Sequence, residues 1–173
     1  FNNDSELFQF GNIEGIARGN SAAGGASQQN ARPYFSRRLG LAADGSPVDM
    51  EYGARISGRQ GRFNIGTLAI RQGEQTGIGA RDLFISRINA NVLEDSQLGF
   101  IYTNGDPASN QDNSVMGVDF QYINNQLPRN RRIQSTVFYQ QSETPGLVGD
   151  DASYGIGIAL PVSAGLRGRV GYK

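Results

Sequence analysis

Histidine and cysteine, the side chains that most hydrolases use as base or nucleophile, do not occur among these 173 residues. Their absence excludes Ser-His-Asp and Cys-His catalysis and the usual zinc ligand sets within the chain. Two adjacent carboxylate pairs remain, Glu94 with Asp95 and Asp150 with Asp151. A glycosidase uses two acids, but both pairs lie among turn-forming residues. We therefore expect solvated turns and no catalytic residues.

The segment 104–113, NGDPASNQDN, carries several oxygen ligands of the kind that calcium prefers. It lacks the ligand spacing and the terminal glutamate of an EF-hand loop. We predict no metal site there, and the sequence indicates no cofactor.

Arginine supplies nearly all the positive charge, since the only lysine is Lys173. We predict that several of these arginines, with a few acids, face a polar interior. The candidate residues for this lumen are Glu51, Arg55, Arg59, Asp119, Arg167 and Arg169. Such arginines could attract anionic solutes. Structural pairing of Arg55 with an acid such as Asp119 or Glu51 is the favoured interpretation.

The elements that position these residues begin with two extended runs, 51–59 and 63–71, joined at 60–62. Because successive side chains of a strand point to opposite faces, the first run separates into a thin apolar face and a charged face. The two predicted faces are Tyr52, Ala54, Ile56 and Gly58, and Glu51, Arg55, Ser57 and Arg59. This pattern predicts a β-hairpin with lipid on one side and a polar lumen on the other.

Further extended runs follow, and the lengths of their connections alternate. We expect short turns at 60–62, 93–96 and 161–165, a medium turn at 124–130, and long loops at 72–80, 104–113 and 144–151. This alternation is typical of an outer-membrane meander, with short periplasmic turns and long external loops.

Residue parity within these runs supports the same architecture. On one parity fall Leu98, Phe100, Tyr102, Met116, Val118, Phe120, Tyr122, Tyr154, Ile156, Ile158 and Leu160. Small and polar residues, including Gly99, Gly117, Asp119 and Gln121, fall on the other. Tyrosines are expected near strand ends, as in an interfacial girdle, at Tyr52, Tyr102, Tyr122, Tyr139, Tyr154 and Tyr172.

The chain divides into an N-terminal segment, 1–48, and the predicted barrel strands, 49–173. In the first part Leu7, Phe8 and Phe10 are expected to anchor a short strand, before a flexible small-residue loop at 19–30. No apolar run approaches the ~20 residues of a transmembrane helix. The net charge is +0 and the only basic cluster is Arg129, Arg131 and Arg132, which argues against nucleic acid as a partner.

Three motifs together resemble one family. The segment FNNDSELFQFG at 1–11 is similar to "FF-x-E-x-x-x-LF-x-F", PYFSRRLG at 33–40 to "FFSRRIG", and YGARISGR with FNIGTL at 52–68 to "GAKLTGK…YNIGLL". The family comprises bacterial outer-membrane β-barrels of unknown function that follow a domain like carbohydrate-binding module family 9. Its most specific motif corresponds to Ser36, Arg37, Arg38 and Gly40. Family barrels are considerably larger, so the resemblance implies a fragment of one.

The sequence thus predicts an all-β antiparallel meander that forms part of a transmembrane barrel in the bacterial outer membrane. Its expected role is transport, export or surface anchoring without catalysis. Expected partners are membrane lipid, the remaining strands of the barrel or another protein that covers the sheet edges, and a saccharide or surface protein. The alternative hypothesis is a soluble all-β carbohydrate-binding module.

Overall fold

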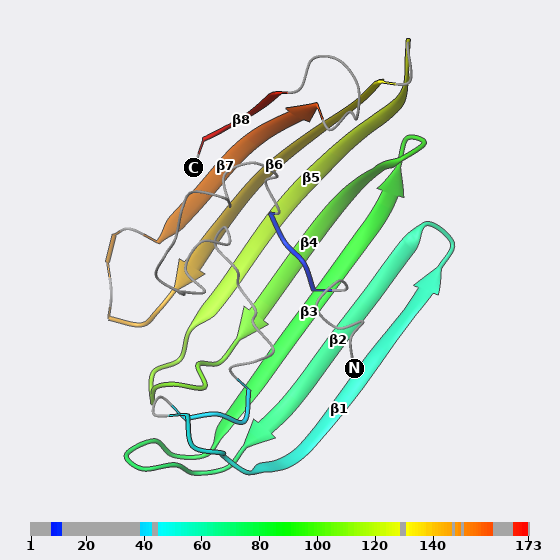
Figure 1. Cartoon of the computed structure of the whole chain (residues 1–173). Coiled ribbons are helices and arrows are strands. Elements are labelled where there is room, and N and C mark those ends of the chain that lie inside the picture. Colours follow the sequence, from blue (N-terminus) through cyan, green and yellow to red (C-terminus); the bar gives the residue numbers. More distant parts are fainter. Residues whose placement is uncertain are drawn as a thin grey trace.

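The computed structural model describes residues 8–11, 39–42, 45–128, 131–146, 148–149, 151–160 and 168–172. These residues form one antiparallel sheet with the strand order β1-β2-β3-β4-β5-β6-β7-β8, so every strand pairs with its neighbours in the chain (Figure 1). The strands are β1 (Met50–Gln60), β2 (Phe63–Gln72), β3 (Arg81–Val92), β4 (Ser96–Asn104), β5 (Ser114–Leu127), β6 (Arg131–Glu143), β7 (Ala152–Leu160) and β8 (Gly168–Tyr172). The predicted all-β antiparallel meander is confirmed.

The connections alternate in length as predicted. The turns at 61–62 and 93–95 are short, and the loops at 73–80 and 105–113 are longer. Three residues separate β5 from β6, and eight separate β6 from β7. Because the strands are antiparallel neighbours, the long loops gather at one end of the sheet and the short turns at the other (Figure 1). The predicted turn at 161–165 lies outside the described residues.

One turn differs from its prediction. The sequence predicted a medium turn at 124–130, but β5 continues to Leu127, which pairs with Arg131. A register irregularity between Asn124 and Leu127 accommodates the extra residues. Polar side chains stabilise this extension, because Gln126 donates to Glu94 and Asn125 to Asp95 in the turn beside it. Asparagine and glutamine therefore do not end the strand here.

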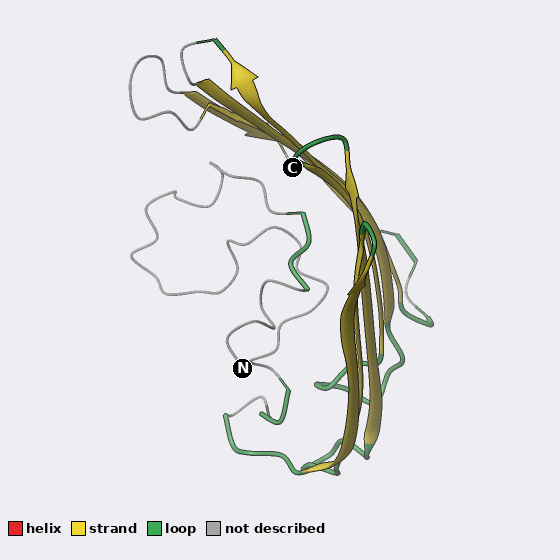
Figure 2. Cartoon of the chain, turned by 90° about the vertical axis from the view of Figure 1, so that its right-hand side faces the viewer, coloured by secondary structure: helices red, strands yellow, loops and turns green. Residues whose placement is uncertain are grey.

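The sheet is a single curved layer, and residues 8–11 lie on its concave side (Figure 2). These residues form no strand, so the predicted strand around Phe8 and Phe10 is wrong for the described part of that segment. Both phenylalanine side chains are instead buried, at 4% and 5% exposure. Phe10 forms an apolar cluster with Ile101 of β4 and Phe138 of β6. Side-chain burial, and not strand pairing, fixes these residues.

The register assigns the remaining residues to the two faces, since directly opposed residues of antiparallel strands share a face. Phe10 lies on the concave side, over Gly117 and against Phe138. The cross-strand rows that contain these two residues therefore form the concave face. One such row is Arg59, Asn64, Asn89, Gly99, Asp119, Phe138 and Gly155. The next is Ser57, Gly66, Arg87, Ile101, Gly117, Gln140 and Ser153. The concave face is therefore mainly polar or small along its middle.

The middle of the convex face is mainly apolar and exposed. Its rows include Ile88, Phe100, Val118, Tyr139 and Tyr154, and beside them Leu98, Phe120, Val137, Ile156 and Tyr172. Nine of these ten side chains are among the exposed large hydrophobic residues, Phe120 being half-buried. The parity predicted for β4, β5 and β7 is thus confirmed.

The six tyrosines expected in a girdle all fall on the convex face by register. Tyr52, Tyr102, Tyr154 and Tyr172 lie within three residues of a strand end, as predicted. Tyr122 and Tyr139 lie further inside β5 and β6 than the prediction of strand-end tyrosines requires. Among the described residues, no helix is long and apolar enough to cross a membrane.

Candidate functional site

A buried ion pair lies at the centre of the concave face. Nη2 of Arg87 in β3 lies 2.6 Å from Oδ1 of Asp119 in β5, and the two side chains are 4% and 12% exposed. Strand β4 separates their strands, and Gly99 of β4 stands in the same row as Asp119. A methyl group on Gly99 would collide with both Nη2 of Arg87 and Oδ1 of Asp119. The ion pair therefore occupies the space that a side chain at Gly99 would take.

The N-terminal segment covers this ion pair through the dipeptide Phe10-Gly11. The amide of Gly11 donates to Oδ2 of Asp119 at 3.2 Å, so both carboxylate oxygens accept a hydrogen bond. The guanidinium carbon of Arg87 lies 5.4 Å from the Phe10 ring centroid, within cation–π range. The same ring meets Phe138 edge to face at 5.7 Å between centroids.

Two glycines make room for this dipeptide. A Cβ atom on Gly117 would overlap the Phe10 ring, and one on Gly11 would lie 2.8 Å from the Phe138 ring. Gly11 also has a φ of +56°, a conformation that residues with a side chain rarely adopt. The close approach of the N-terminal segment to the sheet thus depends on glycine on both sides of the contact.

A small cavity of about 90 Å³ opens beside the ion pair. One wall is the N-terminal segment, through Gln9 and Phe10. The wall from the sheet consists of Arg87 and Asn89 of β3, Gln97 and Gly99 of β4, Asp119 and Gln121 of β5, and Thr136 of β6. All the residues of the sheet wall belong to neighbouring rows of the concave face.

Asp119, predicted to face a polar interior, lies on the concave face and belongs to this site. The register places Arg55 and Arg59 on the same face, but on β1, with β2, β3 and β4 between them and Asp119. Asp119 is therefore beyond the reach of Arg55 as a partner. The structure brings Arg87, and not Arg55, to this carboxylate.

Glu51 does not share the face of Arg55. Its Oε2 lies 3.2 Å from Nε of Arg71, and Arg71 stands opposite Tyr52 on the convex face. The register shifts between Met50 and Tyr52, and this irregularity breaks the strict alternation on which the prediction for Glu51 rested. Arg71 also binds Asp82 at 2.8 Å.

The other predicted residues are placed only in part. Arg169 stands opposite Ala159, in a concave row, while Arg167 lies outside the described residues. Of the family-motif residues Ser36, Arg37, Arg38 and Gly40, the structure describes only Gly40. Its amide donates to Oε1 of the buried Gln72 at 3.5 Å.

Sequence reasoning missed Arg87, the most buried charged residue of the described part of the chain. In the run 82–92 it shares a parity with Leu83 and Ile85, so no alternation of polar and apolar residues marked it. A usable indication was present in Gly99 and Asp119. A glycine between two residues of opposite charge, each one strand away, leaves the space in which they can meet.

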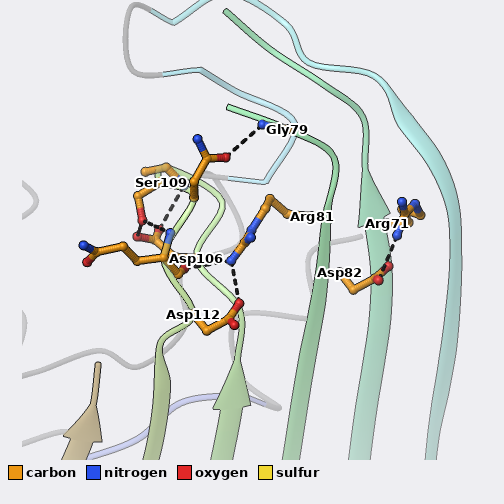
Figure 3. A network of polar contacts seen from close by, with 10 residues as sticks. Arg71, Gly79, Arg81, Asp82, Asp106, Ser109 and Asp112 are labelled. Carbon is orange, nitrogen blue, oxygen red and sulfur yellow. Dashed lines mark hydrogen bonds and ion pairs between the residues drawn. The ribbon is translucent and has the colours of Figure 1, made fainter. Parts of the chain in front are cut away.

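A second polar network ties two long loops together at one end of the sheet. Arg81 binds Asp112 at 2.7 Å and the carbonyl of Gln111 at 2.8 Å (Figure 3). Across the same gap the amide of Gly79 donates to Oδ1 of Asn110 at 2.9 Å, and Nδ2 of Asn110 donates to the carbonyl of Gly77. The loops 73–80 and 105–113 therefore form one connected surface.

Glu94, Asp95 and Asp106 belong to turns and loops. Glu94 and Asp95 are exposed in the turn 93–95 and accept hydrogen bonds from Gln126 and Asn125, while Asp150 lies outside the described residues. In the segment 104–113, Oδ2 of Asp106 accepts a hydrogen bond from Ser109 at 2.6 Å. Within the described residues, no group of three acidic or other metal-binding side chains stands close enough to hold a metal ion.

The arrangement at Arg87 is suited to binding, since it combines a neutralised ion pair, amide side chains and an aromatic ring around a cavity.

No family model matches the chain, no curated protein matches its sequence, and no solved structure matches its fold.

Proposed function

We propose that this sheet forms part of the wall of an outer-membrane β-barrel, with the convex face toward lipid and the concave face toward a polar interior. The role that we infer for such a barrel is transport, export or anchoring at the cell surface. The proposal places lipid on one side of the sheet and a polar medium on the other. It therefore rests on how polar and apolar side chains are distributed between the two faces.

The observation that carries the proposal is that the exposed face of the sheet is apolar while charged side chains are buried on the other face. A water-soluble protein has the opposite distribution. On the convex face Tyr154 is 57% exposed and Met116 is 52% exposed, whereas Arg87 on the concave face is 3% exposed. Contiguous apolar patches beyond a few hundred square ångströms are rare on soluble monomers. Lipid-exposed strands place apolar residues outward and polar residues inward, which is the pattern of β4, β5 and β7.

Loop geometry gives independent support. An outer-membrane meander has short turns on the periplasmic side and long loops outside, and the described connections sort in the same way. Both outer strands also need partners in such a setting, because β1 and β8 each have one neighbour in the described sheet. Further strands of the same barrel, or another protein, would supply them.

Fluorescence quenching in lipid tests the proposal directly. The chain has no tryptophan, so Phe120→Trp on the convex face and Gln121→Trp on the concave face each introduce a single reporter here. The two positions are consecutive in β5 and both are half-buried, which matches them for depth and accessibility. In bilayers with brominated acyl chains, the reporter at position 120 should be quenched strongly and that at 121 weakly.

The competing hypothesis of a soluble carbohydrate-binding module makes the opposite prediction. Such a protein would be recovered from cells without detergent, and brominated lipid would quench neither reporter. Equal quenching at positions 120 and 121 would also contradict the assignment of the faces.

A further inference from the structure

We propose that the cavity beside Arg87 is a binding site for a compact, uncharged ligand that carries several hydroxyl groups. The proposal goes beyond the membrane assignment and does not depend on it, because the cavity and its polar groups exist whatever covers the convex face.

Arg87, which lines the cavity, carries two hydrogen-bond donors without protein partners. Nε and Nη1 of Arg87 are buried and have no acceptor within the described part of the chain. A buried donor that lacks an acceptor destabilises the protein by its full cost of desolvation, so such donors are rare unless a ligand or ordered water completes them. Arg87 is held rigidly by Asp119 and Phe10, so these donors keep fixed directions.

The surrounding side chains both donate and accept hydrogen bonds. Asn89, Gln97 and Gln121 line the sheet wall, Gln9 lines the opposite wall, and among the described residues none of these four amides engages another protein group. An amide offers one carbonyl acceptor and two N–H donors. Hydroxyl groups also donate and accept, so a polyol matches this lining better than a ligand that only accepts.

The charge at the site favours a neutral ligand. Asp119 neutralises Arg87 at 2.6 Å, and the remaining lining residues carry no formal charge. An anion would meet the Asp119 carboxylate beside the same guanidinium. The cavity volume of about 90 Å³ suits a small ligand, such as a three-carbon polyol or one edge of a sugar ring.

Titration of the purified full-length protein with glycerol and D-glucose tests the proposal, with acetate as the anionic comparison. A ligand with so few atoms should bind with a dissociation constant of about 1 mM. Calorimetry or ligand-observed NMR should show saturable binding of the polyols and weaker binding of acetate.

The variant Gln97→Leu removes one amide at the exposed rim of the cavity and should weaken glucose binding about fivefold to tenfold. Gln111→Leu is the matched control, since Gln111 is exposed in the loop 105–113 and makes its hydrogen bonds through the backbone, the carbonyl to Arg81 and the amide to Oγ of Ser109. It should bind glucose as the parent does.

Three outcomes would overturn the proposal. These are the absence of saturable polyol binding at about ten times the expected dissociation constant, tighter binding of acetate than of glucose, and equal glucose affinity in Gln97→Leu and Gln111→Leu. None of them bears on the quenching of the Phe120→Trp and Gln121→Trp variants by brominated lipid, so failure of this proposal is distinguishable from failure of the barrel assignment.

Discussion

Arg87 and Asp119 form their ion pair across an intervening strand, directly over the backbone of Gly99. Strands two positions apart are separated by about 10 Å, a span that the long arginine side chain covers only if the middle strand carries no side chain there. The pair is also desolvated, at 4% and 12% side-chain exposure, so loss of either partner leaves a charge in a buried site.

Gly99→Ala should destabilise the protein by about 3 kcal/mol or more, because the new methyl group displaces the guanidinium from the carboxylate and breaks a buried pair. The measurement is the free energy of unfolding in urea, in micelles if the protein is extracted with detergent. Gly58→Ala is the control, since no atom lies within 4 Å of a Cβ there, and it should change stability by less than about 0.5 kcal/mol. Equal effects of the two substitutions would show that the ion pair does not depend on Gly99.

Arg87→Met and Asp119→Leu should each cost about 3–5 kcal/mol when made alone, since each leaves one buried charge without its partner. The double variant should cost clearly less than the sum, because both charges are then absent and the apolar side chains fill similar space. A double-mutant cycle measures the coupling energy. Strict additivity would mean that the two groups do not stabilise each other.

Phe10→Ala should release residues 8–11 from the concave face without disturbing the sheet. The side chain is 5% exposed and packs on Phe138, so truncation should cost about 3–5 kcal/mol of docking free energy. Hydrogen exchange at the amide of Gly11, which donates to Asp119, should accelerate strongly while the amides of the strands stay protected. Phe100→Ala on the convex face is the control, and slow exchange at Gly11 in both variants would contradict the docking role of Phe10.

The long-loop end of the sheet should face the exterior of intact cells, since the short turns of outer-membrane meanders lie on the periplasmic side. The chain contains no cysteine, so a single introduced thiol gives a clean signal from this region. An impermeant maleimide should label Ala108→Cys in the loop 105–113 and should not label Asp95→Cys in the turn 93–95; both positions are exposed. Labelling at 95 alone would reverse the orientation.

The sequence predicted the strands best where one residue parity is apolar, and the connections best where turn-forming residues are frequent. The hairpin β1–β2 and the faces of β4, β5 and β7 were predicted correctly from alternation alone. Glu51 does not follow the alternation predicted for its strand, because a register irregularity at the start of β1 brings its carboxylate to Arg71. Sequence periodicity cannot reveal such a shift, since the shift depends on how the two strands pair.

The candidate site was less accessible to sequence reasoning. Asp119 was singled out, but its partner Arg87 lies 32 residues earlier and two strands away, so the pair depends on the register of three strands at once. The contact of Phe10-Gly11 with β5 and β6 was also missed, because neither residue belongs to a periodic run. Both relationships depend on Gly99 and Gly117, whose importance becomes visible only when the atoms above them are known.

The docking of residues 8–11 also sets an order of events during folding. Every pairing in the sheet joins strands adjacent in the chain, so hairpins can form one after another as the chain is made. The hydrogen bond from Gly11 to Asp119, in contrast, spans 108 residues, and the Phe10 ring requires Phe138 of β6 to be in place. Residues 8–11, the first of the described residues to be synthesised, therefore cannot dock until β6 has formed. Their docking is a late step, which takes place only once the centre of the sheet is complete.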